Sequence, residues 1–96
     1  MAVFLAEHTH QPETCPASRP EIAGKLLELV SPERARQHGI DIQGEAVLTG
    51  RHHLYLIVDA PSADQVRSYF APFGQLGTLS ITAASPCRDV VKRGAC

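Results

Sequence analysis

The sequence predicts one α+β domain whose strands and helices follow the order βαββαβ. Three observations predict this class. The chain has 96 residues, which is the size of one small domain. Four short segments are rich in strand-forming residues, and two segments place apolar residues at helical spacing. We therefore expect a four-stranded antiparallel sheet in residues 2–84, with two helices on one face and a cysteine-containing tail in residues 85–96.

The first half of the chain should hold one strand and one main helix. Residues 2–10 alternate as a strand does, and three prolines mark residues 11–20 as a loop. Ser18 and Glu21 match a capping box, so the helix should begin at Ser18. Ser31 should cap a second, short helical segment that ends at Gly39. The apolar stripe of the main helix would be Ile22, Leu26, Leu29 and Val30.

The middle of the chain should hold a hairpin. Residues 45–49 and 52–60 have the composition of strands, and Gly50 with Arg51 fits a two-residue turn between them. Within residues 52–60 the aliphatic side chains alternate with polar or aromatic ones, which indicates that one face of this strand is buried. The residues of that aliphatic face are Leu54, Leu56 and Val58.

The last third should hold the second helix, the fourth strand and a short helical tail. Ser62 should cap the helix, and Pro72 with Gly74 should end it. Residues 77–83 alternate as a strand, and residues 85–92 could form one helical turn that stops at Gly94. The buried stripe of the second helix would be Val66, Tyr69, Phe70 and Phe73.

The composition argues against two classes of partner. The formal net charge is -1 and the basic residues are scattered, so a nucleic-acid partner is not expected. No apolar run approaches the roughly 18 residues that cross a bilayer, so no membrane partner is expected. The residues after Met1 lack a basic segment and a cleavage site, and we therefore expect no signal peptide and a cytoplasmic location.

The faces of the sheet suggest a dimer. We expect strands one and three to be parallel neighbours, with Val3 and Leu5 facing the helices. Phe4, Leu48 and Ile57 would then help to form an apolar patch on the uncovered face, which is too large to leave in water. A second copy of the chain should cover this face and make a homodimer. The residues expected there from strands one and three are Phe4, Ala6, His8, His10, His53, Tyr55, Ile57 and Asp59.

The first strand and its loop carry a candidate metal site. His8 and His10 are two residues apart on a strand, so both side chains point to the same face. Cys15 follows in a loop with prolines and could supply a thiolate as third ligand. Asp59, on the neighbouring strand, could orient one of the histidines. Imidazole and thiolate together favour zinc, copper or nickel over magnesium or calcium.

The other histidines and cysteines are weaker candidates. His52 and His53 are adjacent, so at most one can join a site on either face, and the start of strand three is expected far from the end of strand one. Three cysteines cannot form a closed set of disulfides, which favours thiols or ligands. Cys87 would begin the tail helix, where the helix dipole favours thiolate, and Cys96 ends the chain. Both are predicted as further metal ligands.

The element order resembles the ferredoxin-like split βαβ arrangement. Residues 50–93 resemble small bacterial proteins of the dimeric α+β barrel superfamily. The resembling pieces are the strand residues 53–60, the Ser-capped helix after them, and Phe70-Ala71-Pro72-Phe73. The resemblance implies a homodimer. It leaves the activity open, because some relatives bind metals and others are isomerases or monooxygenases.

Three functions therefore remain. The first is a transition-metal carrier, buffer or sensor with His8, His10, Cys15, Cys87 and Cys96 as ligands. The second is a small metal-dependent enzyme inside the dimer barrel, acting on a small molecule. The third is a thiol redox protein in which Cys87 reacts and Cys15 or Cys96 resolves. The catalytic candidates are His53, Tyr55, Asp59 and Cys87.

Overall fold

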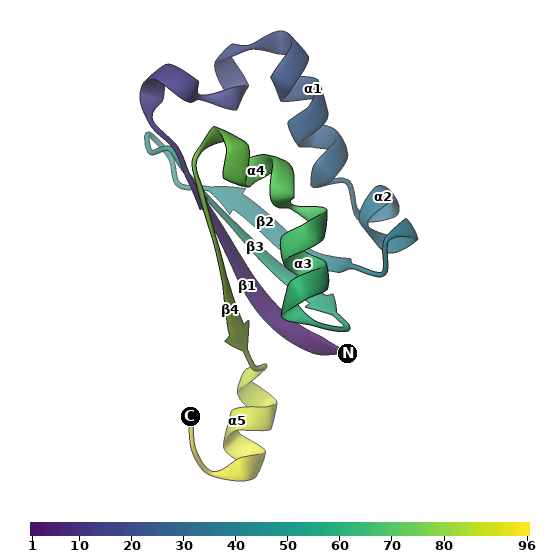
Figure 1. The fold of residues 1–96 in the computed structure, drawn as a ribbon. Helices are drawn as coiled ribbons and strands as arrows, with labels where there is room; N and C mark the ends of the chain where they lie inside the picture. The colour runs from purple at the N-terminus through teal and green to yellow at the C-terminus, as the bar shows by residue number, and fades with distance from the viewer.

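Four antiparallel strands form a single sheet in the computed structural model, which describes residues 1–96 (Figure 1). The strands lie in the order β2-β3-β1-β4. The α+β class and the antiparallel sheet are as the sequence predicts, and the arrangement is compatible with a ferredoxin-like fold. The bounds of the strands are β1 Ala2–Thr9, β2 Asp41–Val47, β3 His53–Ala60 and β4 Thr78–Ala84.

Four helices cover one face of this sheet, and a fifth lies beyond the end of β4 (Figure 1). Two 3-10 turns, η1 (Pro12–Thr14) and η2 (Pro16–Ser18), connect β1 to the first helix. None of the helices has both the length and the apolar composition that a membrane-spanning segment requires. The helices are α1 Pro20–Leu29, α2 Pro32–Gln37, α3 Ala63–Tyr69, α4 Ala71–Leu76 and α5 Cys87–Arg93.

The two central strands, β1 and β3, run antiparallel, so the expectation that they are parallel was wrong. The reason is the connectivity. The chain crosses over the sheet through α1 and α2 before β2, and β3 then returns from β2 by a hairpin. Thr9 therefore pairs with His53, and Val3 pairs with Asp59. Asp59 thus lies at the opposite end of β1 from His8 and cannot orient it.

The helix-facing side of β1 is also the reverse of the expected one. Phe4, Ala6 and His8 are buried, whereas Val3 and Leu5 remain partly exposed. The residues on either side of β1 are apolar enough to be buried, so the pairing of β1 with β3 decides which side faces the helices. Directly paired residues of antiparallel strands share a face, and Phe4, Ala6 and His8 pair with the residues of the buried aliphatic face, Val58, Leu56 and Leu54.

The uncovered side of the sheet is called the open face below. From β1 and β3 it presents Val3, Leu5, Glu7, Thr9, His53, Tyr55, Ile57 and Asp59. The hydrophobic core lies on the other side. There the side chains of Val66, Phe70 and Phe73, which the helical spacing predicts, are fully buried against the sheet. The burial of these three side chains holds α3 and α4 in place.

The capping predictions had mixed outcomes. The Oγ atoms of Ser31 and Ser62 accept hydrogen bonds from backbone N–H groups of α2 and α3, as predicted. Ser18 does not cap α1, which begins at Pro20, and its hydroxyl donates instead to the carbonyl of Cys15 at 2.8 Å. Ser18 therefore stabilises the loop that carries Cys15.

The remaining differences concern the ends of elements. Strand β2 begins at Asp41, four residues before the predicted start, and the hairpin after it spans residues 48–52 instead of two residues. Gly50 has the positive φ that this turn requires. The second main helix breaks at Phe70 into α3 and α4, with Pro72 in the first turn of α4, where its missing N–H costs nothing.

Candidate metal centre

The end of β1 and the start of β3 bring two histidines together. Antiparallel pairing places the last residue of β1, Thr9, opposite the first residue of β3, His53. One residue further out on each strand, the backbone N–H of His10 donates to the carbonyl of His52 at 3.2 Å. His52 alternates with Leu54, so its side chain lies on the helix-covered side of the sheet, as does that of His10.

The loop after β1 returns Cys15 to the same place. Cys15 joins the two 3-10 turns, and its N–H donates to the carbonyl of Pro12 at 3.3 Å. The hydroxyl of Thr14 donates to the carbonyl of Leu76 at 3.3 Å, which ties the loop to the end of α4. With the bond from Ser18, these contacts position a partly buried thiol beside the two imidazoles.

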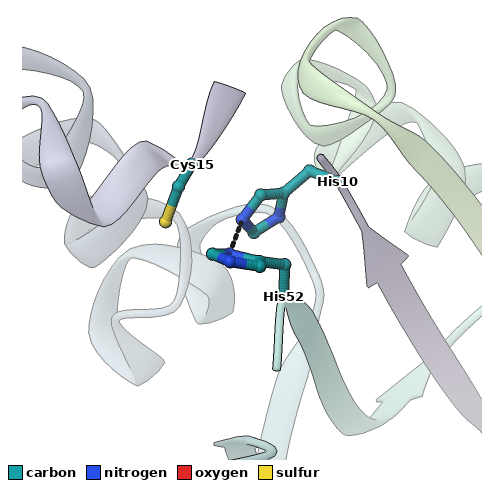
Figure 2. Close-up of side chains that lie close together, drawn as sticks. All are labelled: His10, Cys15 and His52. Atoms are coloured by element: carbon teal, nitrogen blue, oxygen red, sulfur yellow. Dashed lines mark hydrogen bonds between the residues drawn. The ribbon is translucent and has the colours of Figure 1, made fainter. Parts of the chain in front are cut away.

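His10, Cys15 and His52 form a three-residue cluster (Figure 2). One ligand atom from each lies within 4.8 Å of the other two. Nε2 of His10 and Nδ1 of His52 share a hydrogen bond at 3.1 Å, and the tautomers decide which ring donates. All three side chains are partly buried, so a metal ion could bind here.

His8 lies directly behind the cluster. Its ring stacks on His10, with the ring centroids 5.1 Å apart, and on Phe73 at 4.8 Å. The side chain is 1% exposed, and its Nε2 has no hydrogen-bond partner. The structure therefore places His8 next to the three clustered residues without making it one of them.

Burial favours the neutral form of His8 and His10. It is the main cause of the lowered pKa of His8, with a smaller contribution from the charge of His10. Burial likewise lowers the pKa of His10, and His52 adds to this effect. Neutral imidazole is the form that binds metal ions, so the surroundings favour the ligating state.

Gly77 allows β4 to approach the end of β1. A Cβ atom added at this position would overlap the backbone oxygen of Thr9 and lie 3.0 Å from Cα of His10. Its φ of 171° is ordinary extended backbone, so the close approach alone requires glycine here. Gly77 therefore helps to position His10.

The other predicted site residues lie elsewhere. Strand β4 begins beside Thr9 and carries the chain roughly 20 Å away before α5 begins. Cys87 and Cys96, both exposed, follow that strand and do not join the cluster of the same chain. His53, Tyr55 and Asp59 lie on the open face, where His53 contacts the carboxylate of Glu7 at 3.2 Å.

His52 is not among the ligands predicted from the sequence, because the start of β3 is expected far from the end of β1. Two signals could have found it. In a βαββαβ sheet the hairpin makes β3 antiparallel to β1, which brings these two ends together. The alternation of His52 with Leu54 then places His52 on the helix-covered face.

The comparisons with known proteins leave the family open. No protein-family model matches the chain, and no curated protein is significantly similar to it.

Proposed function

We propose that the protein binds one transition-metal ion through His10, Cys15 and His52. The observation that carries this proposal is the convergence of three donor atoms from two strand ends and one loop. Imidazole and thiol donors lose hydration when they are half-buried, and a bound metal ion would compensate for that loss.

The spacing suits a tetrahedral ion. Metal–nitrogen bonds of about 2.0–2.1 Å at a tetrahedral angle separate the two nitrogens by about 3.3 Å. Nε2 of His10 and Nδ1 of His52 are 3.1 Å apart. Binding of the ion would require both nitrogens to be without a proton, so the donating ring would carry its proton on its other nitrogen and both rings would turn toward the ion.

The donor set narrows the choice of metal. Two imidazoles and one thiolate favour zinc, copper or nickel, whereas magnesium and calcium prefer oxygen ligands. Such a site suits a carrier, a buffer or a sensor of these metals. The odd number of cysteines, all unpaired, fits a reducing compartment, and the cytoplasm remains our proposed location.

Elemental analysis of the untagged protein tests this function. The protein would be produced in medium supplied with zinc, copper and nickel, alongside Cys15→Ser and Cys87→Ser. We expect one ion per chain in the wild type and in Cys87→Ser, and a loss of at least tenfold in Cys15→Ser. A metal-free wild type would contradict the proposal, as would an equal loss in both variants.

We also propose that two copies of the chain pair through the open face, as in the dimeric α+β barrel superfamily. Ile57 is 49% exposed there, and α5 extends past the sheet without one buried residue (Figure 1). The charges of the two surfaces are complementary, because α5 is mainly basic and the open face is acidic. This would favour contact between α5 of one copy and the open face of the other. The basic residues of α5 are Arg88, Lys92 and Arg93, and the acidic residues on the open face are Glu7, Asp41 and Asp59.

Sedimentation distinguishes this dimer from a monomer. The wild type should sediment as a dimer, and Ile57→Lys should sediment as a monomer because it places a charge in the interface. Leu27→Lys is the matched control, since Leu27 is 68% exposed on α1 and lies away from the open face. A monomeric wild type would exclude the dimer.

A further inference from the structure

We propose that the metal centre keeps one coordination position open, and that this position holds a water molecule that small inorganic anions can replace. The inference rests on the proposed metal site of His10, Cys15 and His52. It goes beyond that site by naming the ligand that completes the coordination sphere.

The first observation is the number of protein donors. Three residues of ligating type converge, and no fourth histidine, cysteine or carboxylate joins them. Zinc is usually four-coordinate. A site with three protein ligands completes its sphere with water or another small molecule, as catalytic zinc sites do, whereas structural sites have four protein ligands.

The second observation is a small cavity at the cluster. Its volume is about 70 Å³, and it is lined by all three candidate ligands together with His8 and Arg51. At roughly 30 Å³ per molecule, this space has room for about two waters. The rest of the wall is mostly apolar and consists of Pro16, Ala17, Leu26, Val47 and Leu54.

The third observation is an imidazole nitrogen without a partner on His8, a residue of the cavity wall. His8 is 1% exposed and lines the cavity, yet its Nε2 makes no hydrogen bond. In the tautomer that carries its proton on Nδ1, Nε2 of the neutral ring is an acceptor. A metal-bound water would donate to it and satisfy a buried polar atom.

Arg51 gives the cavity a positive charge. It lines the cavity, and its guanidinium forms no ion pair or hydrogen bond within the chain. An unpaired guanidinium beside a metal ion attracts anions. Small anions should therefore compete with water for the open position, with Arg51 favouring the anion and His8 favouring water.

Cobalt(II) and azide test this inference. Cobalt(II) would replace the natural metal, and its visible spectrum would be followed while azide is added. We expect one cobalt ion per chain and a saturable spectral change with azide. Arg51→Gln should bind azide about three- to tenfold more weakly, because about 1 kcal/mol of charge attraction is lost. Arg36→Gln, an exposed arginine of α2, is the matched control and should match the wild type.

The histidine variant should act in the opposite direction. His8→Phe keeps a ring against Phe73 but removes the acceptor for water, so azide should bind several-fold more tightly. If this variant fails to fold, the comparison of Arg51→Gln with Arg36→Gln still tests the inference.

Each outcome has a distinct meaning. Cobalt that binds with a spectrum that azide leaves unchanged would overturn the open position and leave the metal site standing. Equal weakening of azide binding in Arg51→Gln and Arg36→Gln would overturn the assignment to this cavity. A protein that binds no cobalt would overturn the proposed metal site and this inference with it.

Discussion

Nδ1 of His52 lies 3.1 Å from Nε2 of His10, although 42 positions separate the two residues in the sequence. The antiparallel pairing of β1 and β3 produces this contact, and Cys15 completes the cluster from the adjoining loop. The neighbouring His53 points to the other face of the sheet and contacts Glu7. Adjacent histidines thus have different surroundings, which makes them a matched pair for mutation.

His52→Ala should weaken metal binding at least tenfold, because one of the three donors is lost. His53→Ala should leave the affinity within about twofold of the wild type, since its side chain lies on the open face. Competition with a chromophoric chelator measures both affinities. The metal site would be placed wrongly if His53→Ala weakened binding as much as His52→Ala.

Gly77→Ala should destabilise the protein and weaken metal binding together. The new methyl group overlaps the backbone of Thr9 and forces the end of β1 to move, with a cost of roughly 1–3 kcal/mol in the free energy of unfolding. Urea unfolding and metal titration measure the two effects.

The control for this variant is Gly74→Ala. Nothing lies within 4 Å of a Cβ at Gly74, and alanine favours a helix by up to about 1 kcal/mol relative to glycine. We expect Gly74→Ala to be neutral or stabilising. Unchanged stability in Gly77→Ala would show that β4 can shift away from His10 at little cost.

Tyr69→Phe should lower the free energy of unfolding by about 1 kcal/mol. The hydroxyl of Tyr69 donates to the carbonyl of Leu29 at 2.9 Å and joins α3 to the end of α1. Burial raises the pKa of Tyr69, against the opposing influence of Arg34, so the hydroxyl stays a donor at neutral pH. Urea unfolding checks the loss. Tyr55→Phe is the control, because the Tyr55 hydroxyl makes no hydrogen bond within the chain, and a loss of equal size there would refute the assigned role.

The metal-free protein should lose stability as the pH falls below about 6.5. The pKa values of His8 and His10 are lowered from 6.5 in the folded state, first by burial. Between the folded and unfolded pKa values the unfolded chain binds more protons, so acid favours unfolding. The contribution of these two histidines to the free energy of unfolding is therefore fully present above their unfolded pKa. It declines as the pH falls toward their folded pKa values.

Urea unfolding with a chelator, at several pH values between about 5 and 8, measures this dependence. His8→Leu should flatten the decline because it removes one of the two groups. His38→Gln, which changes an exposed histidine of the helical layer, should retain it. A wild-type stability that rises toward acid would have the wrong sign and would refute the explanation.

Local patterns in the sequence determined the strands, the buried stripes and two of the three helix caps tested. Leu54, Leu56 and Val58 alternate, and Val66, Phe70 and Phe73 recur at helical spacing, so each set identifies its own buried face. His10 and Cys15 could be named as candidate ligands because they lie close together along the chain. These features depend on residues that are close together along the chain, so the spacing of residues in the sequence is enough to predict them.

Only the tertiary structure decided which residues meet. The side of β1 that faces the helices could not be read from its sequence, because Val3 and Leu5 are as apolar as Phe4 and Ala6, and pairing with β3 settled it. The same pairing added His52 to the cluster and separated Asp59 from it, whereas the pairing of β4 with β1 carries Cys87 and Cys96 away from it. Strand direction is fixed by the path of the whole chain, so one reversed strand changes which side chains share an end of the sheet.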